Sequence, residues 1–136
     1  MWMIVCLIAA LTFAMGSVAH AQSDLSSLAN GAKQEKEVVW YTTTSAGDNQ
    51  AIVAGFTKKY PFLKVQVLRS TGEKLRQRVL TEATAGQYFS DVLSVSSMEM
   101  GLLKSRNLPQ PYDAPEAESY PAGAKDKEKS FTAIYA

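Results

Sequence analysis

The sequence has almost none of the side chains that carry nucleophilic or metal chemistry. Its one cysteine, Cys6, and its one histidine, His20, both lie near the amino terminus. Ser–His and Cys–His nucleophile pairs are therefore excluded from the rest of the chain, and so is a zinc site built from cysteine and histidine. A disulfide within the chain is excluded because it needs two cysteines. No phosphate-binding loop, G-x-S-x-G or H-E-x-x-H pattern occurs either.

Charge of one sign is also lacking. The chain holds 14 lysine and arginine residues against 13 aspartate and glutamate residues, a net charge of +1. This balance gives no long-range attraction to nucleic acid, so we expect no nucleic-acid partner. Arg69, Lys74, Arg76 and Arg78 form a basic cluster, which on charge alone indicates a solvated helix face.

The amino terminus has the pattern of a secretory signal. Residues 4–14 are apolar or small apart from Thr12, and this run is too short to cross a bilayer, which needs about 20 apolar residues. Ala19 and Ala21 supply the small residues of an A-x-A cleavage site. We expect residues 1–21 to be a signal peptide and residues 22–136 to be exported. No lysine or arginine precedes the apolar run, so an uncleaved cytosolic module stays open as an alternative.

Strand and helix patterns then alternate. Runs of β-formers predict strands at residues 38–41, 63–68 and 91–95. Apolar spacing predicts helices at residues 48–60, 73–85 and 98–106, after a polar helix at 24–36 that frays at Asn30-Gly31. The residues expected on the inner faces of the three later helices are Ile52, Val53 and Phe56; Leu75, Val79 and Ala83; and Leu102 and Leu103.

This alternation predicts an α/β fold with a mostly parallel sheet flanked by helices. The proline-containing residues 107–121 should form an extended surface segment, followed by a charged loop at 122–130. Residues 131–136 have the composition of a further strand. Because the chain stops inside that run and three strands leave open sheet edges, we expect an incomplete lobe.

Hydroxyl side chains gather where the predicted strands end. Parallel α/β sheets bind ligands beyond the carboxyl ends of their strands, where helix amino termini offer free N–H groups. One hydroxyl per helix is an ordinary N-cap, but the run of four at residues 42–45 exceeds what a cap uses. Gly72 would let a ligand approach the backbone. The predicted ligand-binding residues are Thr43, Thr44, Ser45, Ser70, Thr71, Ser96 and Ser97.

Charged residues near these loops offer two other interpretations. Arg76 or Arg78 could reach back toward an anion over Gly72, although a solvated helix residue explains either one. Asp48 and Glu73 could form a catalytic carboxylate pair, although the helix dipole explains acids at helix starts. We expect no catalytic residue and no protein-only metal site.

Five segments carry a family resemblance. They are Val38-Val39-Trp40-Tyr41-Thr42, Phe56-Thr57-Lys58-Lys59-Tyr60-Pro61 before Val65, Arg69-Ser70-Thr71-Gly72-Glu73 before Arg76, Glu82-Ala83-Thr84-Ala85-Gly86 before Asp91-Val92, and Leu102-Leu103-Lys104 before Leu108 and Pro111-Tyr112. In this order they resemble the amino-terminal lobe of bacterial extracellular solute-binding proteins. The branch they resemble is the one labelled iron(III)-type ABC-transporter binding proteins.

The resemblance implies a type 2 periplasmic-binding-protein fold, of which residues 22–136 form a three-layer, partial amino-terminal lobe. Full-length members trap a ligand between two lobes by hinge closure and dock on a membrane permease. The second lobe is absent here, together with the downstream tyrosines that bind iron in ferric members. We expect a periplasmic monomer that captures a ferric ion or an oxyanion-bearing solute for an ABC transporter, with no cofactor and no enzymatic activity. A non-functional fragment and a small exported carboxylate-dependent hydrolase stay open as alternatives.

Overall fold

The computed structural model describes residues 18–112 and 114–132. The chain divides into two compact units, Met1–Glu37 and Val38–Ala136. In the first unit, α1 runs over Val18–Glu35. The predicted fraying at Asn30-Gly31 is wrong, because the helix continues through both residues; one glycine costs a helix only about 1 kcal/mol. Residues 1–17 of the predicted signal peptide lie outside the described residues, so cleavage after Ala21 stays a prediction.

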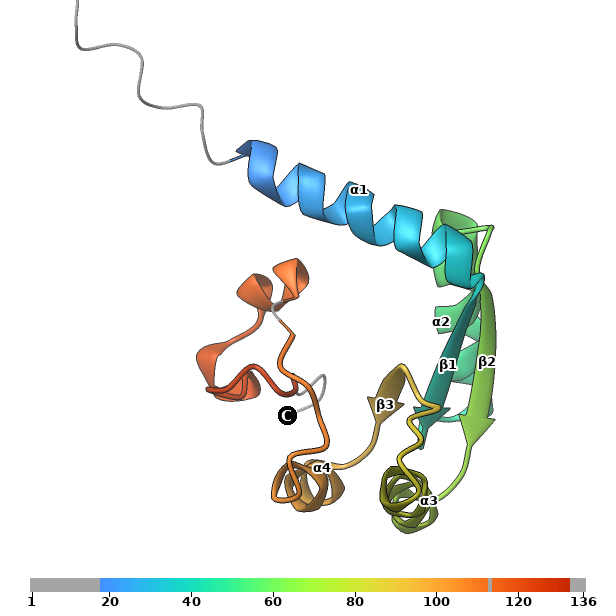
Figure 1. Cartoon of the computed structure of the whole chain (residues 1–136), viewed down its shortest axis with the longest axis vertical. Helices are drawn as coiled ribbons and strands as arrows, with labels where there is room; N and C mark the ends of the chain where they lie inside the picture. The colour runs from blue at the N-terminus through green and yellow to red at the C-terminus, as the bar shows by residue number, and fades with distance from the viewer. Residues whose placement is uncertain (1–17, 113, 133–136) are drawn as a thin grey trace, which may run out of the picture. The chain divides into compact units, whose positions relative to one another are not determined.

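The second unit is built on a parallel sheet, which confirms the predicted α/β class. Its strands are β1 (Glu37–Thr42), β2 (Lys64–Arg69) and β3 (Val92–Ser94), in the order β2-β1-β3. β1 and β3 pair in parallel with Tyr41 opposite Leu93, and the three arrows in Figure 1 point the same way. All three strands therefore end at one edge of the sheet.

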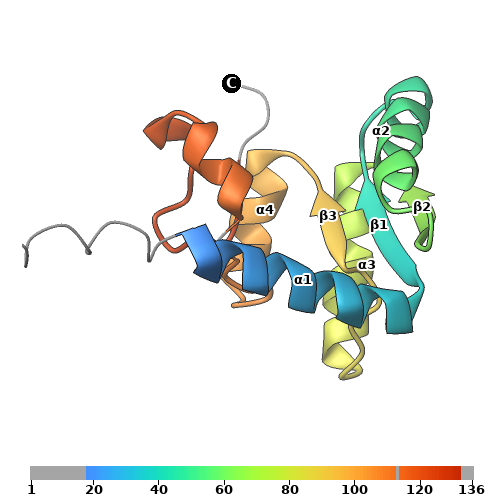
Figure 2. The same ribbon diagram turned by 90° about the horizontal axis from the view of Figure 1, so that it is seen from above.

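Three helices follow the strands in turn. They are α2 (Ala46–Lys59), α3 (Gly72–Thr84) and α4 (Ser97–Lys104), each within two residues of its predicted bounds. α2 packs against β2 and α3 packs against α4, so helices flank the sheet as predicted (Figure 2). No helix in the described part of the chain is long and apolar enough to span a membrane.

A small core holds these layers together. Its buried apolar residues are Trp40, Tyr41, Leu63, Leu75 and Leu103. Leu75 and Leu103 confirm the predicted inner faces of α3 and α4. Ile52 and Leu102, each 48% exposed, were placed inward wrongly. Successive helical residues point about 100° apart, so Leu102 cannot share a direction with Leu103, nor Ile52 with Val53.

Residues after α4 differ in part from the extended segment that the prolines predict. A short 3-10 helix, η1 (Pro115–Ser119), interrupts it, and a second, η2 (Ala122–Ala124), begins the predicted loop. A proline near the start of η1 suits this turn, because its fixed φ is close to the helical value. Lys125 and Thr132 form an antiparallel bridge. Only the first two residues of the strand predicted at 131–136 are described.

Candidate functional site

A pocket of about 420 Å³ opens at the carboxyl ends of β1 and β3. Three parts of the second unit line it: the loop after β1, the end of β3 with the start of α4, and a segment close to the carboxyl terminus. The lining residues are Thr43, Thr44, Leu93, Ser94, Val95, Ser96, Ser97, Met100, Ser130, Phe131 and Thr132. Of the seven predicted ligand-binding residues, Thr43, Thr44, Ser96 and Ser97 share this wall. Ser45, Ser70 and Thr71 do not line it.

Hydrogen bonds hold the strand ends side by side. The backbone N–H of Thr43 donates to the Ser94 carbonyl over 3.0 Å, and the Thr43 hydroxyl donates to the same oxygen over 3.3 Å. The Ser70 N–H donates to the Thr42 carbonyl over 3.2 Å. The three hydroxyl-bearing loops therefore converge on one edge, as the sequence predicts.

Three of the predicted hydroxyls are helix caps. Ser45 accepts from the Asp48 N–H and donates to its carboxylate at 2.7 Å. Thr71 accepts from the Lys74 N–H, and Ser96 accepts from the Glu99 N–H. A cap engages its oxygen but leaves the hydroxyl proton free. Ser96 can thus cap α4 and still donate to a ligand, whereas the Ser45 proton is already used.

Thr44 combines a fixed backbone with a free side chain. Its N–H donates to the Thr42 hydroxyl over 3.0 Å. Its carbonyl accepts from Arg69 Nε over 2.8 Å and from Asn49 Nδ2 over 3.3 Å. Within the described residues the hydroxyls of Thr44 and Ser97 have no hydrogen-bond partner, which makes them the best-placed donors of the pocket.

Asn49 is the one buried side chain of the described residues with an unmatched polar atom. It is 5% exposed, and its Oδ1 has no hydrogen-bond partner there. Its amide nitrogen is the group that binds the Thr44 carbonyl. Asn49 therefore fixes the loop after β1 without facing the pocket.

Gly72 packs closely against the side chain of Glu99. A Cβ there would come within 3.2 Å of Glu99 Cγ, tighter than most contacts. The Glu99 carboxylate also accepts from Arg76 Nε at 2.5 Å. Arg76, a candidate anion ligand on sequence grounds, is thus paired with Glu99, whose side chain is 9% exposed. The sequence did not predict this ion pair, because its two residues are 23 positions apart and no local pattern links them.

Arg78, the other candidate, is likewise engaged. Its Nε lies 2.6 Å from Glu82 Oε1 and 3.0 Å from the Tyr41 hydroxyl. Asp91 also has a structural role, since its carboxylate accepts from the Val39 N–H over 2.7 Å. The structural contacts of Arg76, Arg78 and Asp91 account for their presence without a role in binding or catalysis.

The described wall of the pocket is electrically neutral. Among the described residues no carboxylate, ammonium, guanidinium or imidazole lines it, and they hold no cluster of acidic, cysteine or histidine residues that could bind a metal ion. What the wall offers is hydroxyl protons and the first N–H groups of α4, beside the apolar side chains Leu93, Val95, Met100 and Phe131. Such a surface can bind an oxyanion by hydrogen bonds.

The fold of this chain matches solved structures. No protein-family model matches the chain, and no curated protein sequence does. A structure titled "Trichodesmium (IdiA) (FutA) in complex with iron and citrate ligands" superposes with a TM-score of 0.59 at 24% identity. The alignment covers 68% of this chain. The chain has a solute-binding-protein fold. It spans only 29% of the length of that structure, so this fold is present as a partial lobe.

Part of the pocket wall was not predicted from the sequence. The loops after β1 and β3 were found because hydroxyls at strand ends are a local pattern. Ser130, Phe131 and Thr132 lie more than 30 residues after β3, and nothing in their composition links them to it. Only the folded chain brings them to the pocket.

Proposed function

We propose that this chain is the amino-terminal lobe of an exported, periplasmic solute-binding protein of the iron(III)-type branch. It supplies one half of a site that captures an oxyanion-bearing solute for an ABC transporter, whose permease is its partner. Residues 1–21 are the signal peptide in this proposal. The solved structure that shares the fold was determined with iron and citrate, which agrees with a chelate or carboxylate cargo.

One observation carries the proposal: the neutral, hydroxyl-lined pocket where β1 and β3 end. Neutral donors at a helix amino terminus suit a carboxylate or phosphate oxygen. They do not suit a bare ferric ion, because hard cations need anionic or carbonyl oxygen ligands. A ferric ion would accordingly be held here through its chelating anion.

Seven hydroxyl residues were proposed as contacts, and the geometry ranks them. Thr44 and Ser97 stand first, because their hydroxyls are on the wall and uncommitted. Ser96 follows, since its proton is free. Thr43, Ser45, Ser70 and Thr71 rank lower, because each is bonded elsewhere or lies off the wall.

The test is residue-resolved binding. Residues 22–136 would be titrated with citrate, ferric citrate (or its gallium analogue for the spectra) and phosphate, and the amide signals of residues 43–45 and 96–98 followed by NMR. One lobe encloses a ligand incompletely, and good sites bury most of the ligand surface, so we expect millimolar affinity. A Thr44→Val, Ser97→Ala double variant should abolish the shifts.

The matched control is Thr84→Val, an exposed hydroxyl at the end of α3 that bonds to the Leu80 carbonyl. It should bind like the parent. Shifts that persist in the double variant, or that map away from the pocket, would refute this site. A chain that shows no cooperative unfolding would instead support the non-functional fragment.

A further inference from the structure

The outer wall of the pocket comes from a turn near the carboxyl terminus. Ser130, Phe131 and Thr132 reach the pocket from this turn, although they are far in sequence from the strand ends. Its hydroxyls, on Ser130 and Thr132, have no hydrogen-bond partner within the described residues. The turn adds uncommitted donors to those of Thr44 and Ser97.

Asp126 organises this turn. Its Oδ2 accepts from the Ser130 N–H over 3.2 Å, and its own N–H donates to the Phe131 carbonyl over 3.2 Å. Its carbonyl accepts from the Lys129 N–H over 3.0 Å, and Lys129 adopts a left-handed φ of 58°. The conformation of residues 126–131 therefore depends on one aspartate.

Lys104, the last residue of α4, joins this turn to the helix. Its Nζ lies 2.6 Å from Asp126 Oδ1 and 3.2 Å from Glu128 Oε2, and 5.9 Å from the centre of the Phe131 ring. The Asp126 side chain is 11% exposed, whereas that of Glu128 is 73% exposed. Exposed ion pairs contribute little, so Asp126 is the partner that matters.

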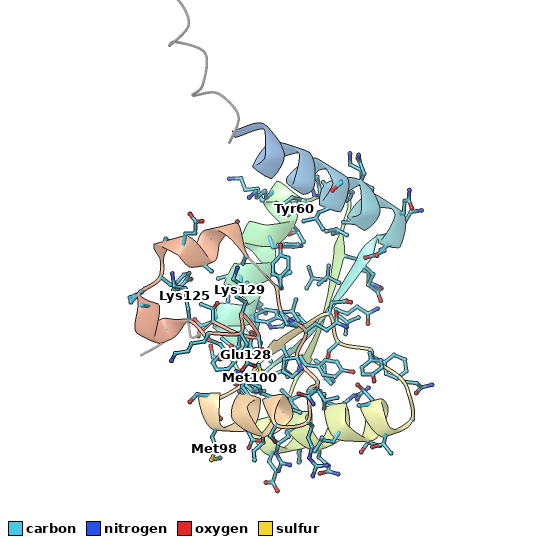
Figure 3. The ribbon with its side chains drawn as sticks, turned by 60° about the vertical axis from the view of Figure 1, so that its left-hand side comes forward. Tyr60, Met98, Met100, Lys125, Glu128 and Lys129 are labelled. Atoms are coloured by element: carbon cyan, nitrogen blue, oxygen red, sulfur yellow. The ribbon has the colours of Figure 1, made fainter. Side chains whose placement is uncertain are left out.

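The same helix supplies the inner wall. Ser97 and Met100 of α4 line the pocket, and Lys104 follows Met100 by one helical turn. In Figure 3 Met100 lies on the side of α4 that faces the turn, whereas Met98, 68% exposed, points away. One face of α4 thus carries both a pocket wall and the cation that fastens the opposing segment.

We infer that Lys104 is a positioning residue that holds the Asp126 turn against α4, so that Ser130 becomes a further ligand contact. The inference rests on the proposed function for its ligand. The Lys104–Asp126 pair itself can be tested without any ligand.

The first measurement is hydrogen exchange of the turn. In Lys104→Met, which keeps the length of the stem but removes the charge, the Ser130, Lys129 and Asp126 amides should lose protection. The Leu75 and Ser105 amides, in α3 and at the end of α4, should keep theirs. Lys104→Arg should restore protection, and so should the charge-exchanged pair Lys104→Asp with Asp126→Lys. Arg106→Met, an exposed cation two residues further on, is the matched control.

The second measurement is binding of citrate to the same variants. Lys104→Met, which releases the whole turn, should weaken citrate binding by about tenfold. Ser130→Ala should also weaken it, and Lys104→Arg should restore it. Unchanged protection in Lys104→Met would overturn the positioning role. Lost protection with unchanged citrate binding would overturn the link to the pocket. If the parent binds no probe, the proposed function fails, while the exchange result still decides the Lys104–Asp126 contact.

Discussion

At the scale of single residues, Tyr41 shows how this small core is fastened. The side chain is 2% exposed, yet its hydroxyl donates to Glu82 Oε1 over 2.9 Å and accepts from Arg78 Nε. The Arg78 guanidinium also lies 5.2 Å from the centre of the tyrosine ring. Burial and the hydrogen bond to Glu82 raise the pKa of Tyr41 above 10.0. One phenol therefore ties β1 to α3.

Replacing Tyr41 with phenylalanine should lower the free energy of unfolding by about 1 kcal/mol, because hydrogen bonds of the buried hydroxyl are lost. Urea unfolding measures this. Tyr88→Phe, at a residue that is 74% exposed, should be neutral. Equal effects of the two changes would contradict the role of Tyr41.

The raised pKa of Tyr41 predicts that the stability of the fold decreases at high pH. Above pH 10 the unfolded chain loses the phenol proton, while the folded chain keeps it until its higher pKa is reached. The parent should therefore lose stability as pH rises through this range. Urea midpoints at several pH values should show a smaller decline for Tyr41→Phe than for Tyr88→Phe.

At the scale of elements, the sequence predicted what is local. Alternating β-formers and amphipathic runs placed β1 to β3 and α2 to α4 within a few residues, and hydroxyls before Ala46, Gly72 and Ser97 are N-caps as their type indicates. Which face of each helix packs inward was predicted only in part. Leu102 and Leu103 are adjacent and of the same residue type, so the sequence does not tell which of them is buried. The pair of Arg76 with Glu99 was missed, since no local pattern encodes a contact across 23 residues.

The orientation of α4 gives a direct test. Leu103→Ala should cost about 2–5 kcal/mol, because Leu103 is 1% exposed and its loss opens a cavity. Leu102→Ala, at a neighbouring residue that is 48% exposed, should cost under about 1 kcal/mol. Thermal unfolding of both variants decides it. A larger loss for Leu102 would mean that the helix packs the other way round.

At the scale of the whole molecule, the second unit forms a partial lobe, and the export of the chain from the cytoplasm is a prediction. We expect expression in a Gram-negative host to yield a periplasmic product whose amino terminus is Gln22, because Ala19 and Ala21 satisfy the cleavage pattern. Mass spectrometry of the periplasmic fraction measures this. Ala21→Glu should leave the precursor uncut. Recovery of the intact chain from the cytoplasm would instead support the uncleaved module.

Both sides of the pocket depend on α4, which has eight residues. Its first residues line the pocket and its last residue, Lys104, holds the opposing turn, so the two must point in matching directions around the helix axis. Each added residue turns a helix by about 100° and lengthens it by about 1.5 Å. One alanine inserted after Leu103 would leave the pocket residues of α4 and the buried Leu103 where they are but swing the lysine ammonium away from Asp126. The two walls of this site can therefore be uncoupled by changing the length of a single helix, with no change to any residue that touches the ligand.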